Sequence, residues 1–226
     1  MQLDLRNATL HELLAAYSAP GVSPAGISAG ALSAAVGAAL ILKVARISER
    51  KISPGPELEK VQMVASKVER LRNMLEDVVD QDAEAYGRLV RIKSAHTKGL
   101  ESFETVERAL KTVTLLPGAM GRAAMICINL ADELVDVAYP VVLSDLYMGA
   151  WLCRAGVEAS LMALNHNLEE ISDTAFCEKI RSKLDFFDHR NDVLERIEAI
   201  AKERKRIAQA VGDKNGSQSE PGTEKR

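Results

Sequence analysis

The chain has 226 residues, of which 47% are hydrophobic and 27% charged, so it holds enough apolar material for one sizeable core. Its formal net charge of -3 gives no electrostatic support for binding nucleic acid. Only 4% of the residues are aromatic, which favours helices packed through small aliphatic side chains over a β-sheet.

The N-terminal part predicts a short helix followed by a break. Residues 3–17 form an amphipathic pattern whose apolar side consists of Leu10, Leu13 and Leu14. Residues 18–28 contain two prolines and two glycines and cannot continue that helix. The first thirty residues lack the basic start and unbroken apolar core of a secretory signal, so we expect a cytoplasmic protein.

Residues 29–48 predict a second helix, with small side chains spread around its whole circumference. Such a helix is expected to be buried on several sides and to let its neighbours approach closely. The apolar stretch ends in Lys43 and Arg46 and is too short and too weakly hydrophobic for a membrane span, so we expect no membrane contact.

The third helix has the clearest periodicity in the chain. Alternating steps of three and four residues connect Val61, Val64, Val68, Leu71, Leu75, Val78, Asp82, Ala85, Leu89 and Ile92. Asp82 is the only charged position of this seam, and a carboxylate in a core costs several kcal/mol unless it is paired or solvated. Asp82 is therefore either a functional carboxylate, a partner of a core Arg or Lys, or a residue at the edge of the seam that reaches water.

The C-terminal half predicts three more helical runs. Residues 103–138 form one run with a break or kink at Pro117-Gly118, and Ser144 or Asp145 is a plausible N-cap for the next helix. That helix carries small or apolar residues at close-packing spacing: Gly149, Leu152, Gly156, Ala159 and Ala163. A last helix is expected over 176–211, and the polar residues 212–226 predict a disordered tail.

These elements predict an all-α fold, an up-and-down bundle of five to six long helices in one domain over residues 1–211. The seams are longer than one short bundle needs, so we expect a homodimer formed through long helices. Three widely spaced cysteines without a Cys-x-x-Cys or Cys/His spacing indicate neither a zinc site nor a disulfide framework.

Three motifs carry a resemblance to a known family. They are Ser23-Pro-Ala-Gly-Ile-Ser28 at the start of the small-residue helix, Asp80-Gln-Asp82-Ala-Glu-Ala-Tyr86, and Ser144-Asp145 followed by Asn167-Leu168 and Asp173. In order and spacing they resemble the cyclodeaminase/cyclohydrolase family, which includes the C-terminal domain of formiminotransferase-cyclodeaminase and the methenyltetrahydrofolate cyclohydrolases.

The resemblance implies a reduced folate as the substrate and a reaction at the one-carbon unit that bridges N5 and N10. It implies no metal and no redox cofactor. Asp82, Asp145 and Lys51 are then the candidate catalytic groups, and Pro24, Gly26, Ser28 and Asn167 are candidates for shaping the substrate pocket. Simpler roles remain open: a helix cap for Asp145, an exposed loop lysine for Lys51, and a contact between two helices for Asn167.

The sequence departs from the family pattern at the glycine loop. Where the family has three successive glycines, this chain has Ala25, Gly26 and Ile27, and Ile27 is expected to project where a ligand's polar group would lie. A cyclohydrolase or cyclodeaminase is the first hypothesis, and a binding or scaffold homodimer that no longer turns over folate is the alternative. A weaker third hypothesis is a related enzyme for a less polar substrate, with Ile27 and Val141-Val142 lining the pocket.

Overall fold

The structure, a computed structural model, describes residues 5 and 7–216. Its elements are α1 (Leu10–Ser18), α2 (Gly26–Glu49), α3 (Pro56–Thr97), α4 (Phe103–Val135), η1 (Pro140–Val142), α5 (Leu143–Glu169), α6 (Thr174–Arg181), η2 (Leu184–Phe187) and α7 (Arg190–Gly216). No β-strand occurs in these residues, and the predicted all-α bundle is confirmed. Of the tail predicted at 212–226, residues 217–226 lie outside the described residues, and helix α7 includes residues 212–216.

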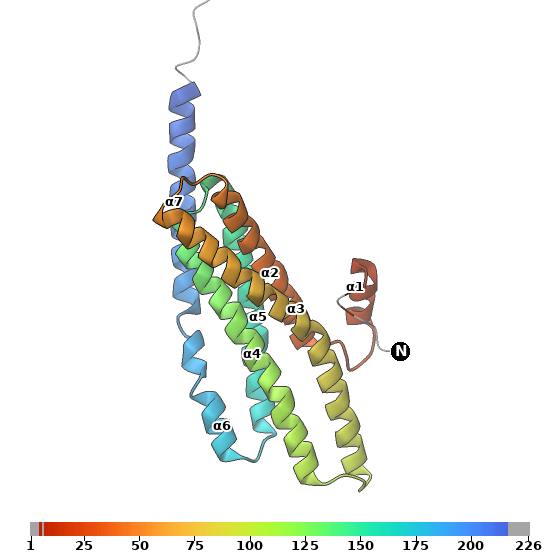
Figure 1. Cartoon of the computed structure of the whole chain (residues 1–226). Coiled ribbons are helices and arrows are strands. Elements are labelled where there is room, and N and C mark those ends of the chain that lie inside the picture. Colours follow the sequence, from red (N-terminus) through yellow and green to blue (C-terminus); the bar gives the residue numbers. More distant parts are fainter. Residues whose placement is uncertain (1–4, 6, 217–226) are drawn as a thin grey trace, which may run out of the picture.

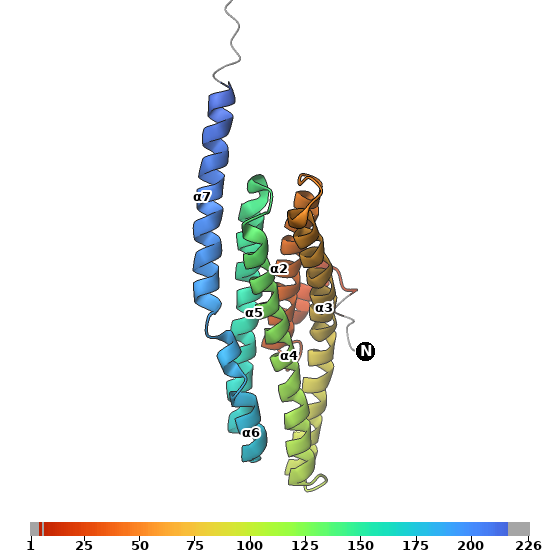
Figure 2. The same cartoon turned by 60° about the vertical axis from the view of Figure 1, so that its left-hand side comes forward.

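The long helices α2, α3, α4 and α5 lie side by side, and α7 packs along α4 and α5 (Figures 1 and 2). Helices α3 and α4 extend well beyond the point where α2 begins, so the N-terminus of α2 faces the middle of α3 (Figure 1). Helix α1 stands beside the bundle and is joined to α2 by a loop. The C-terminal half of α7 projects past the end of the bundle.

The predicted seam of α3 forms one side of the core. Val61, Val64, Val68 and Leu75 are completely buried, as the steps of three and four residues required. Asp82 lies in the same stripe and is only 4% exposed. The periodicity therefore placed this carboxylate in the interior correctly.

Helices α2 and α5 run antiparallel and touch through glycines. A Cβ atom built on Gly37 would lie 2.5 Å from the carbonyl oxygen of Gly149, and one built on Gly156 would lie 3.0 Å from that of Gly30. These distances leave no room for a side chain between the two backbones. The expectation that α2 is buried on several sides and closely approached is confirmed.

Helices α2 and α4 are each long and apolar enough to cross a membrane by length and composition alone. In each case 61% of the most hydrophobic window is buried inside the bundle. Core helices of soluble proteins pass the same test, so this is weak support for a membrane span.

The N-terminal helix begins later than predicted. It starts at Leu10 because Thr9 and Glu12 form a capping box, in which the Glu12 carboxylate accepts from the backbone N–H of Thr9 at 2.8 Å. Of the three leucines expected on its apolar side, only Leu13 is buried, whereas Leu10 and Leu14 are exposed. Helix α1 therefore contributes little to the core.

Of the break or kink predicted at Pro117-Gly118, the break does not occur, because α4 is continuous from Phe103 to Val135. A proline inside a helix costs about 3 kcal/mol through the lost hydrogen bond and a steric clash. Here Pro117 is buried between neighbouring helices, and its carbonyl accepts a hydrogen bond from the Ser160 hydroxyl of α5 at 2.6 Å. Packing on both sides of α4 outweighs the local cost.

Two other boundaries differ from the predictions. Neither Ser144 nor Asp145 caps α5, because the turn η1 leads directly into it and Val142 occupies the N-cap position. The helix expected over 176–211 is divided into α6, η2 and α7. The division places Phe187 in the core, where it is 2% exposed, and the guanidinium of Arg190 donates to its carbonyl at 2.9 Å.

Candidate functional site

The first turn of α2 meets the middle of α3 at Asp82. Ser28, in the third position of α2, is completely buried, and its hydroxyl donates to the carbonyl of Val79 at 2.9 Å. The backbone N–H of Ser28 donates to the Asp82 carboxylate. This N–H is one of those that lack a partner within their own helix, so the start of α2 is suited to receive a negative charge. Two of the predicted residues, Ser28 and Asp82, are thus in direct contact.

Burial raises the pKa of Asp82 from 3.8 to about 6, and the hydrogen bond from Ser28 opposes this shift. Desolvation disfavours the charged form, and here the opposing influence is a backbone N–H rather than a basic side chain. At 4% exposure Asp82 does not lie at a wet edge of the seam, and no ion pair to it occurs in the part of the chain that the structure describes. The exposed fraction and the missing ion pair therefore speak against two of the three interpretations, and the functional carboxylate stays a prediction.

A tyrosine that the sequence did not indicate completes this cluster. The hydroxyl of Tyr17, near the end of α1, lies 2.8 Å from the Ser28 hydroxyl oxygen. Burial raises the pKa of Tyr17, and the charges of Asp82 and Asp80 raise it further. Because Tyr17 lies eleven positions before Ser28, across an irregular loop, helical periodicity gave no signal for this contact.

The loop before α2 is tied to α3 beside Asp82. The hydroxyl of Ser23 donates to the carbonyl of Ala83 at 3.1 Å, and Pro24 follows a cis peptide bond. Helix α2 begins at Gly26, and a Cβ built there would meet nothing within 4 Å. Pro24 and Gly26 therefore lie in the loop and first turn that also hold Ser28.

The expected projection of Ile27 is wrong. Ile27 occupies the second position of α2, and none of the described non-glycine residues has a positive φ. Its partly buried side chain packs against the hydrophobic core. Helical backbone at this position does not need glycine, so replacing the family's glycines with Ala25 and Ile27 leaves the local fold unstrained.

The structure does not bring the other two candidate catalytic residues to Asp82. Asp145 forms an ion pair with Lys43 of α2, with 2.6 Å between carboxylate oxygen and Nζ. Lys43 lies about 22 Å along the axis of α2 from Ser28, at 1.5 Å per residue. The exposed Lys51 lies beyond the end of α2, with its Nζ 5.8 Å from the ring centre of Tyr139. Within one chain, Asp145 and Lys51 belong to the other end of α2.

Asn167 is also separate from Asp82. It lies in the last turn of α5, about 16 Å along that helix from Gly156, which faces Gly30 near the start of α2. Likewise Val141 and Val142 lie in η1 at the start of α5, at the end of the bundle that is remote from Ile27. Within one chain these valines and Ile27 do not line one pocket, so a single chain gives the third hypothesis no structural support.

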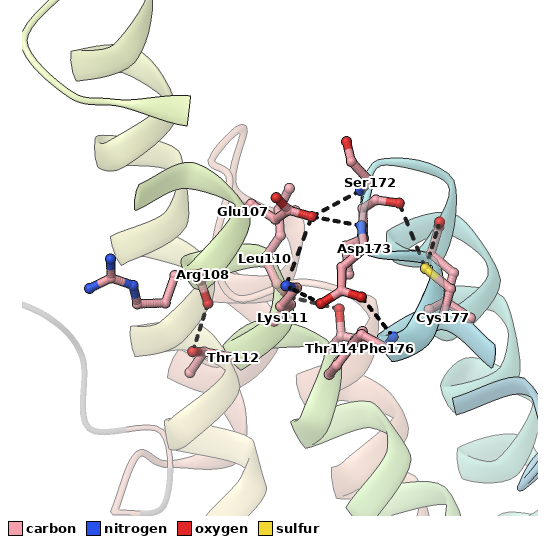
Figure 3. A network of polar contacts seen from close by, with 12 residues as sticks. Glu107, Arg108, Leu110, Lys111, Thr112, Thr114, Ser172, Asp173, Phe176 and Cys177 are labelled. Carbon is pink, nitrogen blue, oxygen red and sulfur yellow. Dashed lines mark hydrogen bonds and ion pairs between the residues drawn. The ribbon is translucent and has the colours of Figure 1, made fainter. Parts of the chain in front are cut away.

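Asp173, the last residue of the third motif, has a structural role at the start of α6 (Figure 3). One carboxylate oxygen accepts from the N–H of Phe176 at 3.0 Å, and the other binds the Lys111 ammonium of α4 at 2.7 Å. Glu107 accepts from the N–H of Asp173 at 2.8 Å. The hydrogen bond from Lys111 lowers the pKa of Asp173. This network fastens α6 to α4.

Two hollows flank the cluster, and Asp82 lines neither. A cavity of about 570 Å³ lies between α1 and the bundle, where its walls include Glu76 and Asp80 of α3. A groove of about 750 Å³ runs between α3 and α4, with Arg88 and Arg108 on its two sides. In this conformation the Asp82 carboxylate therefore opens into neither of these two hollows.

Comparisons with known proteins agree with the all-α fold and with the family resemblance. Residues 9–186 match the model of the formiminotransferase-cyclodeaminase family. A methenyltetrahydrofolate cyclohydrolase from Methylorubrum extorquens is 26% identical over an alignment of 183 residues, and the alignment covers 79% of this chain and 88% of that protein. The crystal structure of a formiminotetrahydrofolate cyclodeaminase from Thermotoga maritima matches with a TM-score of 0.81 over 88% of this chain and 98% of that chain, at 20% identity. At this identity the structural match shows a shared fold.

Proposed function

Because the chain belongs to the formiminotransferase-cyclodeaminase family, we propose that it is a folate one-carbon enzyme, and specifically a methenyltetrahydrofolate cyclohydrolase. The relative from M. extorquens with that name supports the choice, since the alignment covers most of both chains. The observation that carries the proposal is the buried Asp82, whose raised pKa of about 6 suits proton transfer near neutral pH. In keeping with the family, the protein is cytoplasmic.

The reaction needs one group that first accepts a proton and then returns it. The Asp82 carboxylate takes a proton from water as the water oxygen bonds to the methenyl carbon of 5,10-methenyltetrahydrofolate. The protonated Asp82 then gives that proton to N5 as the bond between carbon and N5 breaks. The new hydroxyl loses its proton to solvent, and 10-formyltetrahydrofolate and one proton are released. No metal or redox cofactor takes part in this proposal.

A direct assay tests the proposal. Purified protein is mixed with 5,10-methenyltetrahydrofolate, and the loss of its near-ultraviolet absorbance is compared with that in buffer alone. A parallel assay follows ammonia release from 5-formiminotetrahydrofolate, because cyclodeamination is the related reaction. A rate equal to that of buffer in the first assay, with ammonia release in the second, would replace the cyclohydrolase with a cyclodeaminase.

One observation favours a second candidate function, a binding or scaffold protein that no longer turns over folate. Asp82 is 4% exposed and lines no described cavity, so the carboxylate is out of reach in this conformation. Calorimetry with reduced folates separates the two candidates. Binding without turnover supports the scaffold protein, and no binding of any reduced folate refutes the folate assignment altogether.

We also propose that the protein is a homodimer. Several large apolar side chains on the outer faces of α2 and α5 are exposed: Val36 by 47%, Met148 by 52% and Trp151 by 46%. A second copy is a suitable cover for large apolar side chains that are exposed in this way. Sedimentation equilibrium is expected to give twice the chain mass of 24.6 kDa. Val36→Asp should reduce the mass to that of one chain, whereas Ile207→Asp on α7 should not; a monomeric wild type would refute the dimer.

Asp145→Asn tests whether Asp145 takes part in catalysis. The ion pair with Lys43 is exposed, with 54% of the lysine and 35% of the aspartate side chain accessible, so its loss should cost less than about 1 kcal/mol of unfolding free energy. Because Asp145 is far from Asp82 within one chain, we expect kcat/KM for methenyltetrahydrofolate to stay within about threefold of wild type. A loss of tenfold or more would mean that Asp145 acts in the site, through a second chain or a rearrangement.

A further inference from the structure

The hydrogen bonds around Ser28 have a fixed direction. A serine hydroxyl carries one hydrogen, and that of Ser28 donates to the carbonyl of Val79 at 2.9 Å. The contact of 2.8 Å with Tyr17 must therefore be a donation from the tyrosine hydroxyl to the serine oxygen. The result is a chain that runs from Tyr17 of α1 through Ser28 of α2 to the backbone of α3.

This chain of hydrogen bonds connects the first turn of α2 with both α1 and α3. The Ser28 hydroxyl accepts a hydrogen bond from Tyr17 and donates one to Val79. The backbone N–H of Ser28 points to the Asp82 carboxylate. Among the described residues, the titratable groups that act on the cluster are Tyr17 of α1 and Asp80 of α3. Helix α2 contributes the Ser28 N–H, and the side chain of Tyr17 reaches this contact from α1.

We propose that Tyr17 is a positioning residue for Asp82: its hydroxyl holds Ser28 so that the first turn of α2 stays against the carboxylate and keeps water away. Tyr17 acts through Ser28 and does not need to touch the substrate. The inference rests on the proposed function, because Asp82 has a role in the reaction only if that function is correct. It goes beyond that function by assigning a role to a residue outside the family motifs.

The same contact belongs to the least firmly packed segment beside the site. Asp82 must be uncovered before a substrate can reach it, and α2 is fixed against α5 by the close glycine contacts. Helix α1, in contrast, buries only Leu13 and is separated from α2 and α3 by the cavity of about 570 Å³. The hydroxyls of Tyr17 and Ser23 attach α1 and the loop that follows it to the bundle beside Asp82.

The test removes one oxygen atom in the Tyr17→Phe variant, with Tyr86→Phe on the exposed side of α3 as the matched control. With the hydroxyl gone, water enters more easily and the carboxylate loses its desolvated surroundings. In Tyr17→Phe we expect the acidic limb of the kcat/KM profile to move to lower pH by about one unit, with a rate at pH 7 that is roughly three- to tenfold lower. Tyr86→Phe should leave both unchanged.

A second measurement is independent of folate. The difference in unfolding free energy between each chain and its Asp82→Asn counterpart is measured from pH 4 to pH 8. In the wild type this difference should change between pH 3.8 and the Asp82 pKa of about 6, with a midpoint at about 5, and level off at higher pH. In Tyr17→Phe the midpoint should be lower, and in a Ser28→Ala background Tyr17→Phe should have little further effect.

The outcomes separate the two proposals. If the midpoint of the stability difference moves in Tyr17→Phe but the protein does not turn over folate, the proposed function is refuted. The positioning role of Tyr17 then still holds. A midpoint and an acidic limb that both stay in place refute the positioning role, even if Tyr17→Phe lowers the melting temperature, since a merely structural contact would change stability alone.

Discussion

Replacing Asp82 by asparagine is expected to slow the hydrolysis of 5,10-methenyltetrahydrofolate by about 100- to 10,000-fold, the usual contribution of a positioned acid–base group. Asparagine has the same shape and can still accept the hydrogen bond from the Ser28 N–H, but it cannot take a proton from water. In the wild type, kcat/KM should fall as the pH drops through about 6, because the carboxylate becomes protonated. This limb should be missing from the residual activity of the variant.

The same substitution should make the folded chain more stable at neutral pH. Burial raises the pKa of Asp82 in the folded state to about 6 from 3.8. Folding therefore favours the protonated form, and the stability that this group contributes is complete below pH 3.8 and is lost as the pH rises through about 6. At 1.36 kcal/mol per pKa unit, Asp82→Asn should gain up to about 3 kcal/mol at pH 7.5 and almost nothing at pH 3.5.

Glu84→Gln is the matched control, because Glu84 is an exposed carboxylate on the same helix. It should change neither the rate nor the pH dependence of unfolding in urea. If Asp82→Asn retained full activity, the proposed proton transfer would be wrong. If it were less stable than the wild type at pH 7.5, the carboxylate would have a stabilising partner in solution and the desolvation argument would fail.

Replacing Gly37 by alanine should destabilise the bundle by about 3 kcal/mol or more, or prevent folding. The added Cβ would lie 2.5 Å from the carbonyl oxygen of Gly149 and 2.8 Å from the backbone nitrogen of Cys153. These are backbone atoms of α5, which cannot rotate away as the end of a side chain can. The higher helix propensity of alanine, worth about 1 kcal/mol, offsets only part of the strain.

Gly26→Ala provides the control for Gly37→Ala, since a Cβ at that position meets nothing within 4 Å. Thermal unfolding followed by circular dichroism at 222 nm should show a lower melting temperature for Gly37→Ala and no loss for Gly26→Ala. Equal melting temperatures for the wild type and Gly37→Ala would show that α2 and α5 are farther apart in solution.

Periodicity predicted the parts of the molecule that depend on packing along one helix. The seam of α3 identified the burial of Asp82, and the small residues of α2 and α5 predicted their close approach. Contacts that depend on the geometry of turns and loops could not be predicted from periodicity. The break that buries Phe187 follows from how the chain folds back onto α4, and Tyr17 meets Ser28 only through the shape of the loop between them. The positions of Asp82 and Asp145 at different ends of α2 likewise depend on the antiparallel packing of α5 on α2.

The glycine contact between α2 and α5 also divides the molecule into parts that open at different free energies. If α2 slid or rotated on α5, the two backbones would clash. Helices α2 and α5 should therefore separate only when the whole protein unfolds. Helix α1 has no such constraint and can open at a small cost. The protein therefore combines a rigid frame that fixes Asp82 with a low-stability segment beside it, and local unfolding of that segment leaves the frame folded.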